Sequence, residues 1–91
     1  MKKCYIITFD LKNPGINQQR LIEEIKASKF WARLTSTSYL LLTTKNANEI
    51  RDILLTHLKE EDKIYVGSLE NSAAWYGLGA EISSWIRNNQ K

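Results

Sequence analysis

The sequence predicts a single α+β domain whose elements run β-α-β-β-α-β, with a helical extension at the C-terminus. Two segments, residues 3–10 and 38–44, are apolar at both odd and even positions, as strands covered on both faces are. Other segments repeat apolar residues at helical spacing, and clusters of turn-forming residues separate them. A chain of 91 residues has room for one core. We therefore expect one domain over residues 1–91, with the extension at 70–91.

The first strand is expected over residues 3–10, and Asn13-Pro14-Gly15 should form a turn after it. Proline cannot continue a hydrogen-bonded ladder, so the strand must end before this turn. A helix is then expected from an N-cap at Asn17 to about Ser28. Its apolar stripe consists of Leu21, Ile22 and Ile25.

A weaker strand over residues 31–36 should lead into the second two-faced strand at 38–44. Asn46 and Glu49 then resemble a capping box, which indicates the start of a second helix. This helix is expected to extend to Leu58. Its buried residues should be Ile50, Ile53, Leu54 and Leu58.

A fourth strand is expected over residues 63–69 and a last helix over about 80–88. This order is the ferredoxin-like arrangement, a two-layer sandwich in which the first and third strands are central. The two helices that connect the strands can cover only one face of the sheet. Because both central strands are apolar on both sides, the other face needs a cover as well. Either the C-terminal segment or a second copy of the chain can provide it.

Composition excludes several classes of protein. The longest apolar run, Tyr39 to Leu42, is far shorter than the roughly 20 residues that a membrane span needs. No signal peptide is expected, because Lys2 and Lys3 lead directly into strand-like sequence. The single cysteine, Cys4, lies in an apolar strand, where it is expected to be inert. These features predict a cytoplasmic protein without membrane association.

The positive charge is concentrated in the first half of the chain. The net charge is +3, and residues 1–45 carry eight basic residues against three acids. Such a half can attract the phosphate backbone of RNA or DNA, or its lysines can simply solvate the surface. Around Lys29 and Arg33, basic and aromatic residues are mixed as in single-strand binders, although Phe30 and Trp31 can equally end the first helix in the core. The candidate nucleic-acid contacts are Lys12, Arg20, Lys29 and Arg33.

Asp10 is the most informative candidate for chemistry, because it is the only acid among the first 22 residues and ends the first strand. A carboxylate there can cap a turn through its side chain, or it can bind a divalent cation such as Mg²⁺ or Mn²⁺. One carboxylate is a small ligand set, but two copies of Asp10 across a dimer axis could suffice for a hydrated cation, with phosphate oxygens as the other ligands. The only histidine, His57, is expected to be a solvated residue at a helix end. Three C-terminal aromatic residues are expected to seal a core or a dimer seam: Trp75, Tyr76 and Trp85.

The run from Tyr5 to Leu11, with Asp10 at its end, resembles the CRISPR-associated Cas two family and the related virulence-associated protein D toxins. The Asp10-Leu11-Lys12-Asn13-Pro14-Gly15 segment is similar to that of small bacterial proteins called SinR-like. The resemblance implies a ferredoxin-like homodimer that binds a divalent cation at Asp10. We therefore expect a nucleic-acid-associated homodimer, and a candidate metal-dependent endonuclease acting on RNA or DNA. The alternative is a non-catalytic dimerising module that binds a protein partner in defence or regulation.

Overall fold

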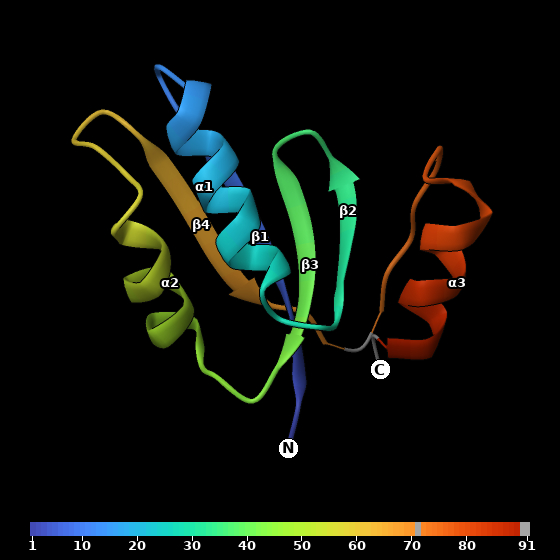
Figure 1. Cartoon of the computed structure of the whole chain (residues 1–91). Coiled ribbons are helices and arrows are strands. Elements are labelled where there is room, and N and C mark those ends of the chain that lie inside the picture. Colours follow the sequence, from blue (N-terminus) through green and yellow to red (C-terminus); the bar gives the residue numbers. More distant parts are fainter. Residues whose placement is uncertain (71, 90–91) are drawn as a thin grey trace.

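A computed structural model describes residues 1–70 and 72–89 of the chain as a four-stranded antiparallel sheet with three helices (Figure 1). The sheet has the strand order β2-β3-β1-β4. The α+β class is therefore confirmed, and the two strands predicted to be apolar on both faces, β1 and β3, are the central pair. The elements are β1 (Lys3–Asp10), α1 (Gly15–Lys26), β2 (Trp31–Thr35), β3 (Ser38–Thr43), α2 (Ala47–Leu55), β4 (Lys63–Ser68) and α3 (Gly79–Asn89). Among these helices, none is long and apolar enough to cross a membrane.

Helices α1 and α2 cover one face of the sheet. Alternate side chains of the central strands point toward them, so Ile7 is fully buried and Tyr39 is 1% exposed. The aromatic rings of Phe9 and Tyr39 stack with their centroids 6.4 Å apart. This main core consists of Tyr5, Ile7, Phe9, Leu11, Leu21, Ile25, Tyr39, Leu41, Ile50 and Leu54.

The C-terminal segment covers part of the other face, which was one of the two alternatives left open by the sequence. Helix α3 lies on the side of the sheet opposite α1 and α2, beside β2 (Figure 1). Ile86 of α3 is 4% exposed, and it forms a second apolar cluster with Cys4, Ala32 and Leu40 of the sheet. Partly buried residues packed around this second cluster are Ile6, Leu34, Leu42, Leu69, Trp75, Leu78, Ile82 and Trp85.

Toward β4, the second face of the sheet is open. Tyr65 projects from β4 and is 63% exposed. Its ring lies close over Gly67: a Cβ atom added at Gly67 would be only 2.7 Å from Tyr65 Cε2. On β1, the neighbouring side chain of Thr8 accepts a hydrogen bond from the Ser38 hydroxyl at 3.0 Å. The open part of the sheet is therefore polar apart from one aromatic ring.

Helix α1 begins earlier than predicted, and Asn17 is not its N-cap. The helix starts at Gly15, with Pro14 in the capping position and no side-chain cap. Proline has a fixed φ that suits a helix start, and the Pro14 carbonyl accepts the first helical hydrogen bond, from the Gln18 amide at 2.8 Å. The proline that ends the strand therefore also begins the helix.

The capping box of α2 is confirmed. The Asn46 side chain accepts from the Glu49 amide at 2.8 Å, and the Glu49 carboxylate accepts from the Asn46 amide at 2.9 Å. The predicted C-terminal end at Leu58 is wrong, because α2 ends at Leu55 and the next amides bond three residues back rather than four. Ile53, expected in the core, is 37% exposed.

Candidate nucleic-acid interface

Asp10 lies at the end of β1, exposed and opposite Lys63 of β4 in the sheet register. By strand alternation its side chain shares the second face with Thr8, on the part that α3 leaves open. A shallow hollow there is lined by residues of β1 and β4, including Asp10 and Tyr65. Within the described ranges, no hydrogen bond reaches the Asp10 carboxylate. Asp10 is thus available to a ligand.

The turn after β1 is held by a different carboxylate, which the sequence reasoning did not single out. Asp62, just before β4, accepts hydrogen bonds from the Lys12 amide at 3.0 Å and from the Lys59 amide at 2.8 Å. Asp62 therefore ties the β1–α1 loop to the α2–β4 loop. The only sequence signal for this role was its position in a polar turn, 50 residues from its partner Lys12.

The described residues offer few ligands for Mg²⁺ or Mn²⁺ around Asp10. In the part of the chain that the structure describes, no group of three or more carboxylate, histidine or cysteine side chains could hold a metal ion. An octahedral divalent cation held by one or two carboxylates fills its other positions with water or phosphate oxygens. One copy of the chain supplies one such carboxylate, so the residues fit a divalent cation only when a second Asp10 or a phosphate joins them.

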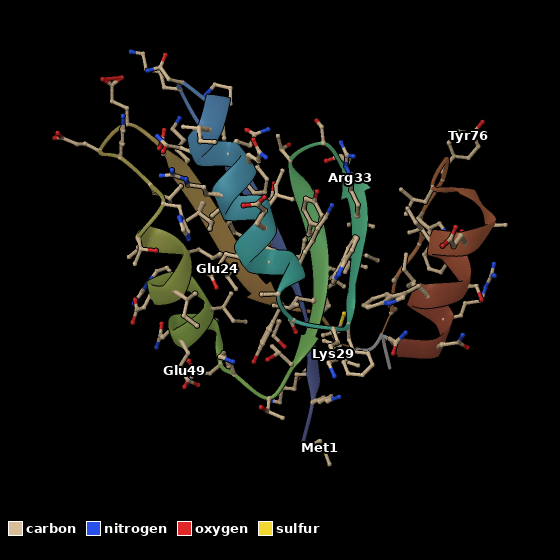
Figure 2. The ribbon with its side chains drawn as sticks, viewed as in Figure 1. Met1, Glu24, Lys29, Arg33, Glu49 and Tyr76 are labelled. Carbon is tan, nitrogen blue, oxygen red and sulfur yellow. The ribbon has the colours of Figure 1, made fainter. Side chains whose placement is uncertain are left out.

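The four basic residues predicted to contact nucleic acid do not lie together. Lys12 forms an ion pair with Glu61 on the β4 side of the molecule, and Arg20 is exposed on α1. Lys29 precedes β2 and Arg33 lies within it, at the opposite edge of the sheet, and Figure 2 shows the two labelled side chains toward opposite ends of the strand. Lys29 and Arg33 therefore share the β2 edge of the sheet, whereas Lys12 lies on the β4 side.

Two further lysines lie at the β2 edge of the sheet, and the sequence did not indicate them as candidates. Lys2 Nζ lies 3.8 Å from the centroid of the Phe30 ring, and Lys26 Nζ lies 4.9 Å from that of Trp31. An ammonium over an aromatic face is attracted by the negative centre of the ring. We call this surface the β2 strip; it consists of Lys2, Lys26, Lys29, Phe30, Trp31 and Arg33.

The sheet register explains how these distant residues meet. Lys3 pairs with Thr43, and the Leu42 amide donates to the Phe30 carbonyl at 2.9 Å, so the N-terminus and Phe30 lie beside the same end of β3. Phe30 is 43% exposed and lies after the end of α1. The alternative in which Phe30 ends the first helix inside the core is therefore wrong. Trp31 begins β2 and packs its ring 6.2 Å from that of Tyr39, which anchors the strip to the core.

The charge of the β2 strip is not neutralised by carboxylates. The three ion pairs of the described residues are Lys12–Glu61, Arg51–Asp52 and His57–Glu24, and none includes a cation of the strip. Among the described residues, the Arg33 guanidinium donates to the Thr35 carbonyl at 3.2 Å. Two cations over aromatic rings, and two more along the same edge of the sheet, form no ion pair within the described part of the chain and can attract a nucleic-acid backbone.

His57 does not behave as a solvated helix-end residue. Its Nε2 atom lies 3.1 Å from Glu24 Oε1, which links the end of α2 to α1. Its side chain is only 22% exposed. The histidine therefore supports the packing of the two helices.

The remaining sequence candidates are Cys4 and the three C-terminal aromatic residues, of which Cys4, Trp75 and Trp85 have structural roles. Burial raises the pKa of the Cys4 thiol, in keeping with the inert role expected for it. Trp75 donates to the Ser83 hydroxyl at 2.9 Å, and it packs with Trp85 against the second cluster. Tyr76 is 98% exposed and points away from the fold, so it is not part of the core, and its place in a dimer seam stays a prediction (Figure 2).

Comparison of the sequence with protein-family models and with curated proteins found no match.

Proposed function

We propose that this chain is a nucleic-acid-associated protein of ferredoxin-like fold, and that the β2 strip binds the phosphate backbone of single-stranded RNA or DNA. The observation that carries the proposal is a row of cations along the β2 edge of the sheet. Lys2 and Lys26 lie over the rings of Phe30 and Trp31. Lys29 and Arg33 flank these two aromatic residues in sequence, and none of the four cations has a carboxylate partner among the described residues. The element order and the strand order β2-β3-β1-β4 support the fold assignment.

Binding of this kind is electrostatic and largely independent of sequence. Each phosphate that a lysine or arginine neutralises releases counterions, so affinity falls as salt rises. With four cations in the strip, the slope of log K against log salt should reach at most about −3 for a single strand. The rings add stacking surface, but each already carries a lysine over one face, so phosphate contacts dominate.

The test is fluorescence anisotropy of labelled 20-nucleotide single strands and duplexes, over a series of salt concentrations. We expect measurable binding at low salt, similar affinity for unrelated sequences, and a slope between about −2 and −3. Absence of binding at low salt would refute the proposal. It would favour the non-catalytic module that binds a protein partner.

We also propose a second activity at Asp10, as a divalent-metal-dependent endonuclease in a homodimer related to the Cas two family. The exposed Asp10 carboxylate, with no hydrogen-bond partner in the described residues, favours it. In a homodimer, two Asp10 carboxylates would hold Mg²⁺ or Mn²⁺, and the ion would stabilise charge on the scissile phosphate. The open part of the second face, around Tyr65, is the surface available for a second copy.

Cleavage of RNA and DNA in the presence of Mg²⁺ or Mn²⁺ tests this activity, with Asp10→Asn as the decisive variant. The amide keeps the shape of the carboxylate and removes its charge, so cleavage should be lost while the oligomeric state is kept. Cleavage that survives in Asp10→Asn would remove Asp10 from the mechanism. A monomer at tens of micromolar in light scattering would remove the shared ion.

A further inference from the structure

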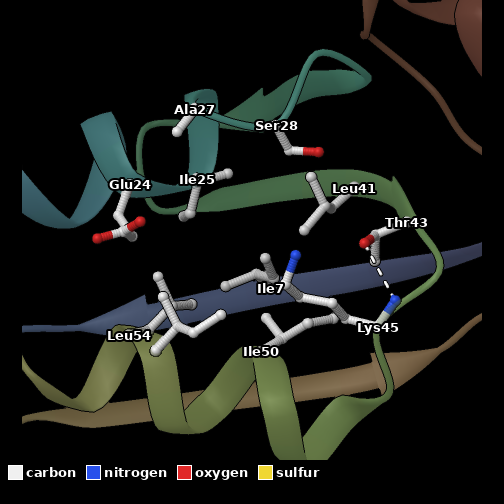
Figure 3. Close-up of a pocket in the computed structure, with 11 residues that line it drawn as sticks. Ile7, Glu24, Ile25, Ala27, Ser28, Leu41, Thr43, Lys45, Ile50 and Leu54 are labelled. Carbon is white, nitrogen blue, oxygen red and sulfur yellow. Dashed lines mark hydrogen bonds between the residues drawn. The ribbon is translucent and has the colours of Figure 1, made fainter.

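A third candidate site, besides the β2 strip and Asp10, lies between α1 and α2. There, a hollow of about 200 Å³ opens where the C-terminal end of α1 faces the start of α2 (Figure 3). Its walls are mostly apolar, and they come from Ile25, Leu41, Ile50 and Leu54 in particular. A closed apolar cavity of about 150 Å³ can hold a ligand the size of benzene. The hollow therefore has room for a body of about six carbons.

One charged group reaches over this apolar surface without a carboxylate partner. Lys45 lines the hollow, and its exposed side chain extends across it in the view of Figure 3. Its backbone is held in place by a hydrogen bond from the Lys45 amide to Thr43 Oγ1 at 3.2 Å. Lys45 belongs to none of the ion pairs of the described residues.

Among the described residues, Glu24 is the one acid that lines the hollow, and it is already engaged. The Glu24 carboxylate lies 3.1 Å from His57 Nε2, so it is paired with the ring that links the two helices. Lys45 is therefore the cation that a bound anion would meet. Apolar walls with one free ammonium at the mouth complement a small molecule that carries one negative charge on an apolar body.

We propose that the hollow between α1 and α2 binds a small monocarboxylate with an apolar body of about six carbons, whose carboxylate pairs with Lys45. The apolar body would pack against Ile25, Leu41 and Ile50, and the carboxylate would remain at the mouth, partly in water. This site shares no residue with the β2 strip, although the strip's Lys26 and Lys29 adjoin its lining residues in the chain, and its occupancy can be tested without nucleic acid.

The experiment is a two-dimensional NMR titration of the full ¹⁵N-labelled chain with hexanoate, hexanol and hexylamine. We expect saturable shifts at the amides of Ile25, Leu41 and Ile50. Hexanoate should bind roughly fivefold more tightly than hexanol, the usual strength of one exposed ion pair, and hexylamine should bind more weakly than both. Shifts that do not saturate, shifts located elsewhere, or equal affinities for hexanoate and hexanol would overturn the proposal.

Two substitutions of Lys45 make the test specific. Lys45→Met and Lys45→Gln remove the charge from an exposed side chain, so both should keep the fold and the binding of hexanol while losing the preference for hexanoate. Lys59→Met removes the same charge outside the hollow and should keep that preference. A preference that survives both Lys45 variants, or that is lost in Lys59→Met, would contradict the assignment of Lys45.

Discussion

Replacement of Ile86 tests whether the C-terminal segment really covers the second face of the sheet. Ile86 is 4% exposed and packs against Cys4, so Cys4 can report whether α3 is docked. Truncation of a buried isoleucine to alanine costs about 2–5 kcal/mol. Because only one helix, α3, has to be displaced, we take the lower value of about 2 kcal/mol. A loss of this size would raise the population of molecules in which α3 is undocked from the sheet about 30-fold.

The assay is the rate of Cys4 modification by a thiol reagent under native conditions. Ile86→Ala should raise this rate about 30-fold, and the milder Ile86→Val, at about 1 kcal/mol, should raise it about fivefold. The matched control is Ile25→Val, because Ile25 is equally buried, at 2%, but lies in the main core under α1. It should lower the global stability by a similar amount and leave the Cys4 rate unchanged.

Two results would refute this reasoning. A Cys4 rate that Ile86→Ala leaves unchanged would mean that α3 does not shield the second face. Equal acceleration by Ile86→Val and Ile25→Val would mean that Cys4 reacts only after global unfolding, so that α3 does not open as a separate unit.

Three further predictions concern individual contacts. Asn46→Ala removes the cap of α2 and should lower the free energy of unfolding by about 1 kcal/mol in urea titrations, whereas Asn48→Ala, two residues on in the first turn of the helix, should change it little. Gly67→Ala places a Cβ atom against the Tyr65 ring, so it should shift the Tyr65 ring signals in NMR; unchanged signals would mean that the ring does not lie over Gly67. His57→Ala breaks the link to Glu24 and should lower the midpoint of thermal unfolding slightly, by an amount that Glu24→Gln reproduces if the contact is ionic.

The strands could be predicted from the sequence more accurately than the helix ends. The run from Cys4 to Phe9 is apolar at every position but one, so β1 and its central place followed directly from the need for cover on both faces. The start of α1 could not be predicted in the same way, because Pro14 is compatible both with a turn and with a helix start. Likewise, the exposure of Ile53 depends on the rotation of α2 against the sheet, which periodicity leaves open.

The candidate sites were harder to predict, because they depend on contacts between distant segments. Lys29 and Arg33 are close in sequence and were found. Lys2 reaches the strip only through the pairing of β1, β3 and β2, and Lys26 reaches the Trp31 ring from the last turn of α1. Asp62 took the turn role considered for Asp10, across a separation of 50 residues. The exposed position of Asp10 at the end of β1 followed from the sequence, and its metal-binding role remains a prediction.

The most direct test of the central claim compares two triple charge reversals in their binding to a labelled single strand. Lys26→Glu/Lys29→Glu/Arg33→Glu reverses the β2 strip, whereas Lys12→Glu/Lys59→Glu/Lys63→Glu reverses three cations on the β4 side and gives the same net charge. The account predicts that the first variant loses binding at low salt and that the second retains most of the affinity. Equal losses in the two variants would show that only net charge matters, and would contradict a binding surface at β2.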